Sequence, residues 1–168
     1  RDLCAPALDL FLKLRLGRIL SGKPALRSNS HDFSQYSEPQ GEWGLRCNLQ
    51  FYLERSRGVL CSPDQIVICS GLQQGLDIVA QLIKGSHGSV AIENPGYHLP
   101  RDVFNNHGFN INPIDVDANG IKLNALKASP STVVYITPSH QMPLGHVMPV
   151  ANRLKLISWS QEVDGIII

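Results

Sequence analysis

The chain has 168 residues, of which 43% are hydrophobic and 17% are charged, and its formal net charge is +1. This apolar fraction suffices for a folded core, and together with the small net charge it excludes an intrinsically disordered chain. No run approaches the ~18 consecutive apolar residues of a membrane-spanning helix, and the near-neutral charge argues against a surface built to bind nucleic acid. The charged fraction lies below the ~25% usual in globular domains, so we expect part of the surface to be covered.

The N-terminal region differs in composition from the rest of the chain. Residues 8–20 are rich in Leu and in basic residues and predict a helix, and the polar residues 21–44 predict a long loop. A basic amphipathic helix can face a membrane or nucleic acid. Packing of its Leu face on a neighbouring element is the commoner use and the one we favour. We therefore expect residues 1–35 to form an N-terminal helix and a linker arm.

Helical and strand patterns alternate from residue 42 onward. Helices are predicted over residues 42–57, 72–83, 97–107, 123–128 and 150–162. Short β-branched runs predict strands over residues 65–69, 89–92, 109–114, 132–136 and 165–168. This alternation predicts an α/β fold with a mainly parallel sheet and helices on both faces. Because the chain stops at three Ile residues, typical of a strand buried on both faces, we expect a fragment truncated at its C-terminus.

Cysteine usage favours a reducing, cytoplasmic compartment. The four cysteines lie far apart and include no C-x-x-C pair, so the sequence predicts no metal site. Cys69 falls in an apolar run and is expected to be a small core residue. Basic residues interrupt the apolar run near the N-terminus, so no signal peptide is predicted.

Ligands of open α/β sheets bind where strands end and helices begin. The turn Ser70-Gly71-Leu72, followed by Gln73, connects a predicted strand directly to a helix. Backbone N–H groups at a helix N-terminus bind anions, and the Gly lets a phosphate approach the backbone. The alternative is that Ser70 merely caps the helix. The turn has neither the P-loop nor the dinucleotide-binding pattern.

Two further strand ends carry candidate ligand-binding residues. Tyr97 follows an Asn-Pro-Gly turn and opens a helix, where it could either stack on a planar ligand or pack over the strand end. His140 and Gln141 lie in a loop between two prolines. A lone His is usually structural, but its place in a strand-exit loop favours contact with a ligand. The absence of a G-x-S-x-G turn makes a hydrolase an unsupported interpretation.

These motifs in combination resemble the aminotransferase-like domain of the MocR-type bacterial transcriptional regulators, a branch of the GntR family. The matching strings are Tyr36-Ser37-Glu38-Pro39-Gln40-Gly41, Leu45-Arg46, Arg57-Gly58-Val59, Ser70-Gly71-Leu72-Gln73-Gln74, Glu93-Asn94-Pro95-Gly96-Tyr97, Asp117-Ala118-Asn119-Gly120 and Thr137-Pro138-Ser139-His140-Gln141. The resemblance covers residues 36–168. It separates the chain from ordinary class I aminotransferases, whose last loop usually reads Asn-Pro-Thr-Gly.

The resemblance implies a partial fold type I aminotransferase large domain that binds pyridoxal 5′-phosphate (PLP). By this resemblance Ser70, Gly71, Leu72 and Gln73 would hold the cofactor phosphate, and Tyr97 would lie on the pyridine ring. His140 and Gln141 would lie near the ring oxygen. Tyr36 would reach the phosphate of the neighbouring subunit in a homodimer.

The resemblance also implies residues that this chain lacks. The family's Asp beside the pyridine nitrogen and its Schiff-base Lys would fall beyond Ile168, so we expect no catalytic residue and no covalent attachment of PLP here. We expect an effector-sensing domain that responds to a small amine or amino acid. DNA would be bound only through a separate winged-helix domain, and no membrane is involved. The alternatives are a fragment of a class I/II PLP-dependent aminotransferase and a dimerisation scaffold that has lost its cofactor.

Overall fold

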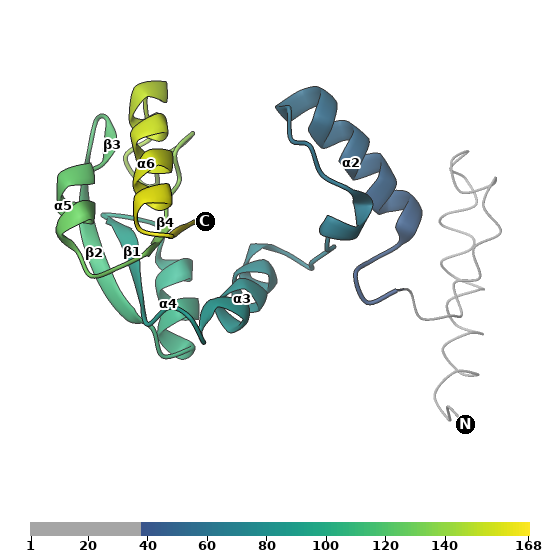
Figure 1. The fold of residues 1–168 in the computed structure, drawn as a ribbon, viewed down its shortest axis with the longest axis horizontal. Coiled ribbons are helices and arrows are strands. Elements are labelled where there is room, and N and C mark those ends of the chain that lie inside the picture. Colours follow the sequence, from purple (N-terminus) through teal and green to yellow (C-terminus); the bar gives the residue numbers. More distant parts are fainter. Residues whose placement is uncertain (1–37) are drawn as a thin grey trace. The chain divides into compact units, whose positions relative to one another are not determined.

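The structure is a computed structural model that describes residues 38–168. It divides into two compact units, an N-terminal unit that ends at Ile68 and a C-terminal unit from Cys69 to Ile168 (Figure 1). Each unit is considered by itself. The predicted helix over residues 8–20 and the candidate residue Tyr36 lie outside the described residues.

The N-terminal unit is built on helix α2, Trp43–Arg57. Glu42 caps its first turn by accepting a hydrogen bond from the Leu45 N–H at 2.8 Å, and Gly58 ends it in the left-handed conformation at φ 65°. The predicted helix is therefore confirmed. Its buried residue is Arg46, whereas the apolar Leu45 is exposed.

The prediction of a strand over residues 65–69 is wrong. Pro63–Gln65 form a short 3-10 helix, η2, and no described strand includes residues 66–69. The backbone at Ile66 is extended, and the Ile68 N–H donates to the Gln40 carbonyl at 2.8 Å, but no neighbouring strand continues this pairing. A β-branched run favours extended backbone, whereas a sheet also needs a partner strand. Cys69 is half-buried and is not a core residue.

A five-stranded sheet in the order β3-β2-β1-β4-β5 forms the centre of the C-terminal unit (Figure 1). Its strands are β1 Ser89–Asn94, β2 Asn110–Asp117, β3 Gly120–Ile121, β4 Val133–Tyr135 and β5 Ile166–Ile167. All pairings are parallel except the β2–β3 hairpin, which the sequence analysis did not predict. The side chains of β5 are half-buried, because within the described residues this strand has a neighbour on one side only.

Helices cover both faces of this sheet, and each face has its own core. Helices α3 (Leu72–Ile83) and α4 (His98–Asn106) pack on one face. Helices α5 (Leu123–Ala128) and α6 (Val150–Glu162) pack on the other. Alternate residues of β1 and β4 supply the two cores, as the period of a strand requires. The predicted α/β fold is thus confirmed.

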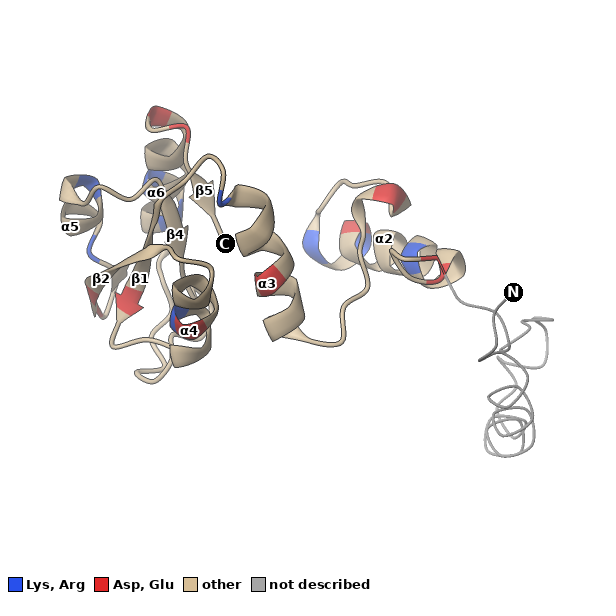
Figure 2. Ribbon diagram, turned by 90° about the horizontal axis from the view of Figure 1, so that it is seen from below, with Lys and Arg blue, Asp and Glu red and all other residues tan. Residues whose placement is uncertain are grey.

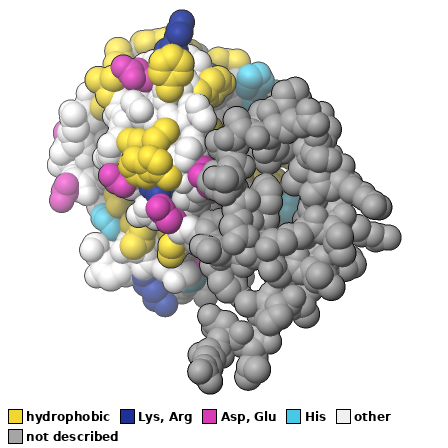
Figure 3. Space-filling view, turned by 90° about the vertical axis from the view of Figure 1, so that its right-hand side faces the viewer, with side chains coloured by type: hydrophobic (Ala, Val, Ile, Leu, Met, Phe, Trp, Pro, Cys, Tyr) yellow, Lys and Arg dark blue, Asp and Glu magenta, His cyan; other side chains and the backbone are white. Residues whose placement is uncertain are grey.

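Apolar side chains also remain at the surface. Figure 3 shows hydrophobic side chains gathered among polar ones on the face that it presents. On α6, Val150, Leu154 and Ile157 are exposed along one side of the helix. In residues 38–168, every helix is too short or too polar to traverse a lipid bilayer.

Candidate functional site

The sheet topology places Tyr97 and the loop after β4 at one edge of the sheet, whereas the Ser70 turn follows no described strand and its pocket borders the last turn of α4, the end opposite Tyr97. From β1 the chain adds β2 and β3 on one side and then β4 and β5 on the other, so the order of strands reverses between β1 and β4. Ligands of open α/β sheets bind outside the carboxyl ends of the strands at such a point. Figure 2 shows acidic residues at the carboxyl ends of β1 and β2.

The N-terminus of α3 presents a turn whose backbone is open. Gly71 is the N-cap, no side chain caps the helix, and a Cβ built on Gly71 would meet no atom within 4 Å. The first backbone N–H groups of a helix have no partner within the helix. The N–H and hydroxyl groups of Ser70 instead contact Gln74 Oε1, at 2.6 and 2.8 Å. Ser70 is therefore not the helix cap, and the turn retains free donors for an anion.

A pocket of ≈ 350 Å³ lies beside this turn, between α3 and α4. Its lining residues are Ser70, Gln73, Gln74, Asp77, Val103 and Asn106. Three of the predicted phosphate-binding positions, Gly71, Leu72 and Gln73, are exposed on the same first turn of α3. The structure thus places Ser70, Gly71, Leu72 and Gln73 together.

Tyr97 stands at the start of α4, where it is the N-cap and is half-buried. Its ring makes an edge contact with His98, with ring centroids 5.3 Å apart. The preceding Gly96 approaches the backbone closely, because a Cβ there would lie 2.2 Å from the Glu93 carbonyl oxygen. The turn thus fixes Tyr97 while leaving part of its ring accessible.

The loop after β4 separates the two residues that the sequence predicted in it. His140 is exposed, whereas Gln141 is 3% exposed. The Gln141 amide donates to the carbonyl oxygens of Pro95 and Met142, at 2.8 Å each, and its Oε1 accepts from the Leu144 N–H at 3.1 Å. Both amide hydrogens are thus used within the protein, so Gln141 holds the loop while His140 remains accessible.

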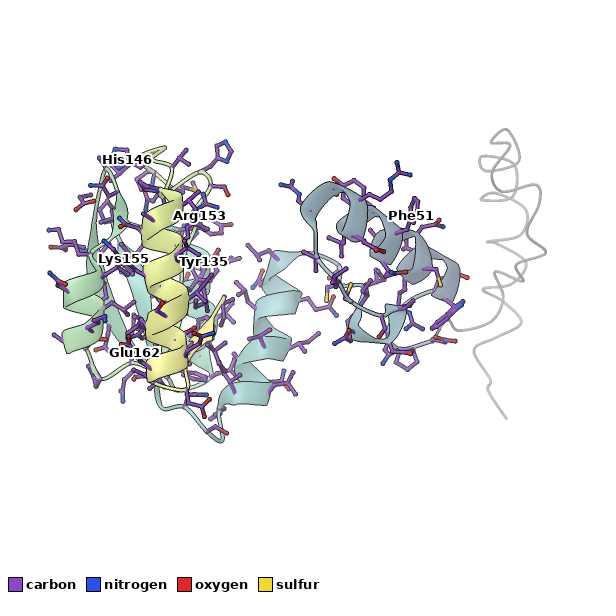
Figure 4. The ribbon with its side chains drawn as sticks, turned by 45° about the horizontal axis from the view of Figure 1, so that its top comes forward. Phe51, Tyr135, His146, Arg153, Lys155 and Glu162 are labelled. Atoms are coloured by element: carbon purple, nitrogen blue, oxygen red, sulfur yellow. The ribbon has the colours of Figure 1, made fainter. Side chains whose placement is uncertain are left out.

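Arg153 on α6 fixes the base of the same loop (Figure 4). Its guanidinium donates to the carbonyl oxygens of Met148 at 2.9 Å and Pro138 at 2.8 Å. The Met148 N–H also donates to the Pro138 carbonyl at 2.9 Å. These contacts close the loop onto itself and hold it at the sheet edge.

Sequence reasoning did not single out Glu93 or Tyr135, which lie at the ends of β1 and β4. Glu93 is 3% exposed and accepts hydrogen bonds from the loop after β4. Burial raises the pKa of the Tyr135 phenol, and the nearby Glu93 and Tyr97 raise it further. Glu93 could have been found from the sequence, because it adjoins a run of apolar strand residues. A carboxylate buried in such a strand needs hydrogen-bond partners.

The aminotransferase class I and II family matches residues 15–168. The chain belongs to this family. Among its relatives, an uncharacterized HTH-type transcriptional regulator, YdeL of Bacillus subtilis, is 36% identical over 86% of this chain and 31% of its own length. The probable rhizopine catabolism regulatory protein MocR of Rhizobium meliloti is 30% identical over 84% of this chain and 29% of its own length.

A solved aminotransferase shows the same fold. The α-aminoadipate aminotransferase LysN of Thermus thermophilus, complexed with N-(5′-phosphopyridoxyl)-L-leucine, is 26% identical, with a TM-score of 0.70. The match covers 97% of this chain and 40% of that protein. This aminotransferase-family chain therefore has part of a fold type I domain, and its resemblance to the MocR-type regulators is confirmed. It spans about a third of the length of the curated relatives.

Proposed function

We propose that this chain is the part of a regulatory PLP domain that holds the cofactor's phosphate and carries the platform for its ring. The observation that carries the proposal is the uncapped N-terminus of α3, which lies in the same unit as Tyr97. When bound, PLP would supply an aldehyde that condenses with amines and a pyridine ring that withdraws electrons. The effector class that follows from this chemistry is a small amine or amino acid.

The donor set at the turn fits a phosphate. Free N–H groups at the start of a 12-residue helix attract an anion through hydrogen bonds and through the helix dipole. The open space over Gly71 lets a phosphate reach these groups without meeting a side chain. The Ser70 hydroxyl lies at the same turn and becomes a further donor when it rotates away from Gln74.

The regulatory interpretation rests on the relatives. YdeL, an uncharacterized transcriptional regulator, and MocR, a probable regulatory protein, are 36% and 30% identical to this chain, compared with 26% for the aminotransferase LysN. In a regulator, effector binding at the domain would shift a conformational equilibrium that the DNA-binding part senses. A homodimer in which Tyr36 reaches the partner's phosphate belongs to the same proposal. If a winged-helix domain is found encoded upstream of this chain, it would support the regulator over the aminotransferase.

A charge placed at Gly71 tests the phosphate site. The residue has extended backbone at φ 162° and open space around it, and Asp and Asn are both favoured N-caps, so Gly71→Asp and Gly71→Asn should both fold. Only Gly71→Asp adds a negative charge. We expect it to weaken the binding of PLP and of inorganic phosphate by about tenfold or more relative to Gly71→Asn, because like charges repel.

Binding is measured by titrating PLP and inorganic phosphate while following the chain's intrinsic fluorescence and the ³¹P resonance. Urea denaturation of both variants checks that the fold is retained. Equal affinities in Gly71→Asp and Gly71→Asn would place the phosphate elsewhere and overturn the proposal. An unmodified chain that binds neither compound would also overturn it.

A further inference from the structure

Glu93 joins two loops at the carboxyl edge of the sheet. It is the penultimate residue of β1, with 3% of its surface exposed. Its Oε2 accepts hydrogen bonds from the Thr137 hydroxyl at 2.6 Å and from the Thr137 N–H at 3.2 Å. Thr137 is the second residue after β4. A buried carboxylate therefore fixes the point at which the next loop leaves the sheet.

A second path links the same two loops through Gln141. Its Nε2 lies 3.5 Å from Glu93 Oε2 and 2.8 Å from the Pro95 carbonyl oxygen. The Thr137 hydroxyl oxygen also accepts from the Met142 N–H at 3.4 Å. The carboxylate thus lies at the centre of a network that spans from the β1 turn to the loop after β4.

The network adjoins the predicted ring platform on the β1 side. Gly96 packs directly on the Glu93 backbone, and Tyr97 follows it. Tyr135 on β4 is paired in register with Ile92, the residue before Glu93. A displacement of Glu93 would therefore move the turn that carries Tyr97 as well as the loop that carries His140.

We propose that Glu93 is a positioning residue that locks the loop of residues 137–146 to the turn of residues 93–97, so that Tyr97 and His140 form one rim for the cofactor ring. The identity of the ligand, the cofactor ring, rests on the proposed function. The coupling of the two loops rests only on the contacts of Glu93. Within the described residues, the N–H and hydroxyl groups of Ser70 bond to Gln74 and not to this network, so the phosphate turn should act independently.

Substitution of Glu93 separates ring binding from phosphate binding. In Glu93→Gln, the neutral amide weakens the hydrogen bonds from Thr137. We expect amide hydrogen exchange at Thr137 and Met142 to become faster by about tenfold or more, the effect of losing one charge-assisted hydrogen bond. PLP affinity should fall by about tenfold for the same reason, whereas the affinity for inorganic phosphate should stay within about twofold.

Asp115→Asn is the matched control. Asp115 is an exposed carboxylate of β2 that pairs with Lys122 at 3.5 Å, so its neutralisation leaves the Glu93 network intact. We expect this variant to keep the exchange rates and the PLP affinity of the unmodified chain. The double variant Glu93→Gln, Thr137→Val should be no less stable than the less stable of the two single variants, because both substitutions remove the same contact.

The outcomes are distinguishable. If the unmodified chain binds phosphate but not PLP, the proposed function fails, and the exchange rates still test the coupling. If Glu93→Gln binds PLP and exchanges its Thr137 amide as the unmodified chain does, the role of Glu93 is overturned. If phosphate and PLP affinities fall together while the exchange at Thr137 is unchanged, Glu93 does not act through this loop.

Discussion

The Nε2 atom of His107 lies 2.6 Å from Oδ1 of Asp77, which joins the C-cap of α4 to the middle of α3. Asp77 also accepts a hydrogen bond from the Gln81 side chain at 2.7 Å and lines the pocket beside Ser70. The two helices that frame the candidate phosphate turn are therefore tied together by one acid–imidazole contact.

This contact predicts a loss of stability in acid. The hydrogen bond from His107 holds the pKa of the Asp77 carboxyl below its ordinary value of 3.8, and the bond from Gln81 acts in the same direction. Because the folded-state pKa is lowered, the stabilisation is present above the unfolded pKa and is lost as pH falls through the folded pKa. We expect Asp77→Asn to lower the free energy of unfolding near neutral pH, and its difference from the unmodified chain to vanish in strong acid.

Urea denaturation at a series of pH values measures this difference. Asp102→Asn is the control, since Asp102 is an exposed residue of the neighbouring helix α4. A constant difference between Asp77→Asn and the unmodified chain across the whole acid range would show that the contact makes no pH-dependent contribution.

The close approach at Gly96 predicts a specific cost for a single methyl group. A Cβ at this position would lie 2.2 Å from the Glu93 carbonyl oxygen, a backbone atom that cannot move without the strand. We expect Gly96→Ala to destabilise the chain by about 1–3 kcal/mol, the usual cost of overpacking. Gly88→Ala, where no atom lies within 4 Å of the new Cβ, should change the stability by less than about 0.5 kcal/mol. Thermal denaturation compares the two, and equal effects would contradict the predicted clash.

The buried phenol of Tyr135 predicts a loss of stability in alkali. Burial raises the pKa of this group above its ordinary value of 10.0, with Glu93 and Tyr97 adding to the effect. A raised folded-state pKa means that stability is intact below the unfolded value and declines as pH rises from there toward the folded value. We expect the unmodified chain to lose stability relative to Tyr135→Phe as the pH rises above about 10.

Tyr52→Phe provides the control for this alkaline effect, because Tyr52 is exposed and lies in the N-terminal unit. The unfolding free energies of all three proteins are compared by urea denaturation at each pH. If Tyr135→Phe and Tyr52→Phe respond alike to alkali, the environment of Tyr135 is not the cause.

Local signals predicted most of the elements in this chain. The bounds of α3, α5 and α6 match the predicted ranges, because each combines an apolar face with a residue that stops or starts a helix. The predicted strands over residues 89–92 and 132–136 also lie in the sheet as β1 and β4. The order of strands in the sheet could not be derived from these local signals, because it depends on hydrogen bonds between strands that are far apart in the sequence.

Residues held by hydrogen bonds outside regular helix and strand pairing were predicted less well. Arg46 occupies a helix face that its charge would place in solvent, yet it is 1% exposed. Its guanidinium donates to the carbonyl oxygens of Gly41 at 3.0 Å and Pro63 at 3.1 Å, and neither acceptor can be inferred from helical periodicity. Gln141 stays predicted beside the ligand, but the hydrogen bonds of its buried amide to the carbonyl oxygens of Pro95 and Met142 could not be derived from the loop sequence.

The strand order has a consequence for the sequence of events in folding. The contacts of the Ser70 turn join residues four apart, whereas Glu93 and Thr137 are 44 apart. Contacts between distant residues form slowly, because closing a long loop costs chain entropy before the contact repays it. We therefore expect a refolding chain to acquire its anion-binding turn early and the rim of Tyr97 and His140 only after β4 has docked beside β1. During that interval the folding domain would bind any phosphate group at the turn. It could not yet distinguish PLP from inorganic phosphate, because the rim that contacts the ring would not have formed.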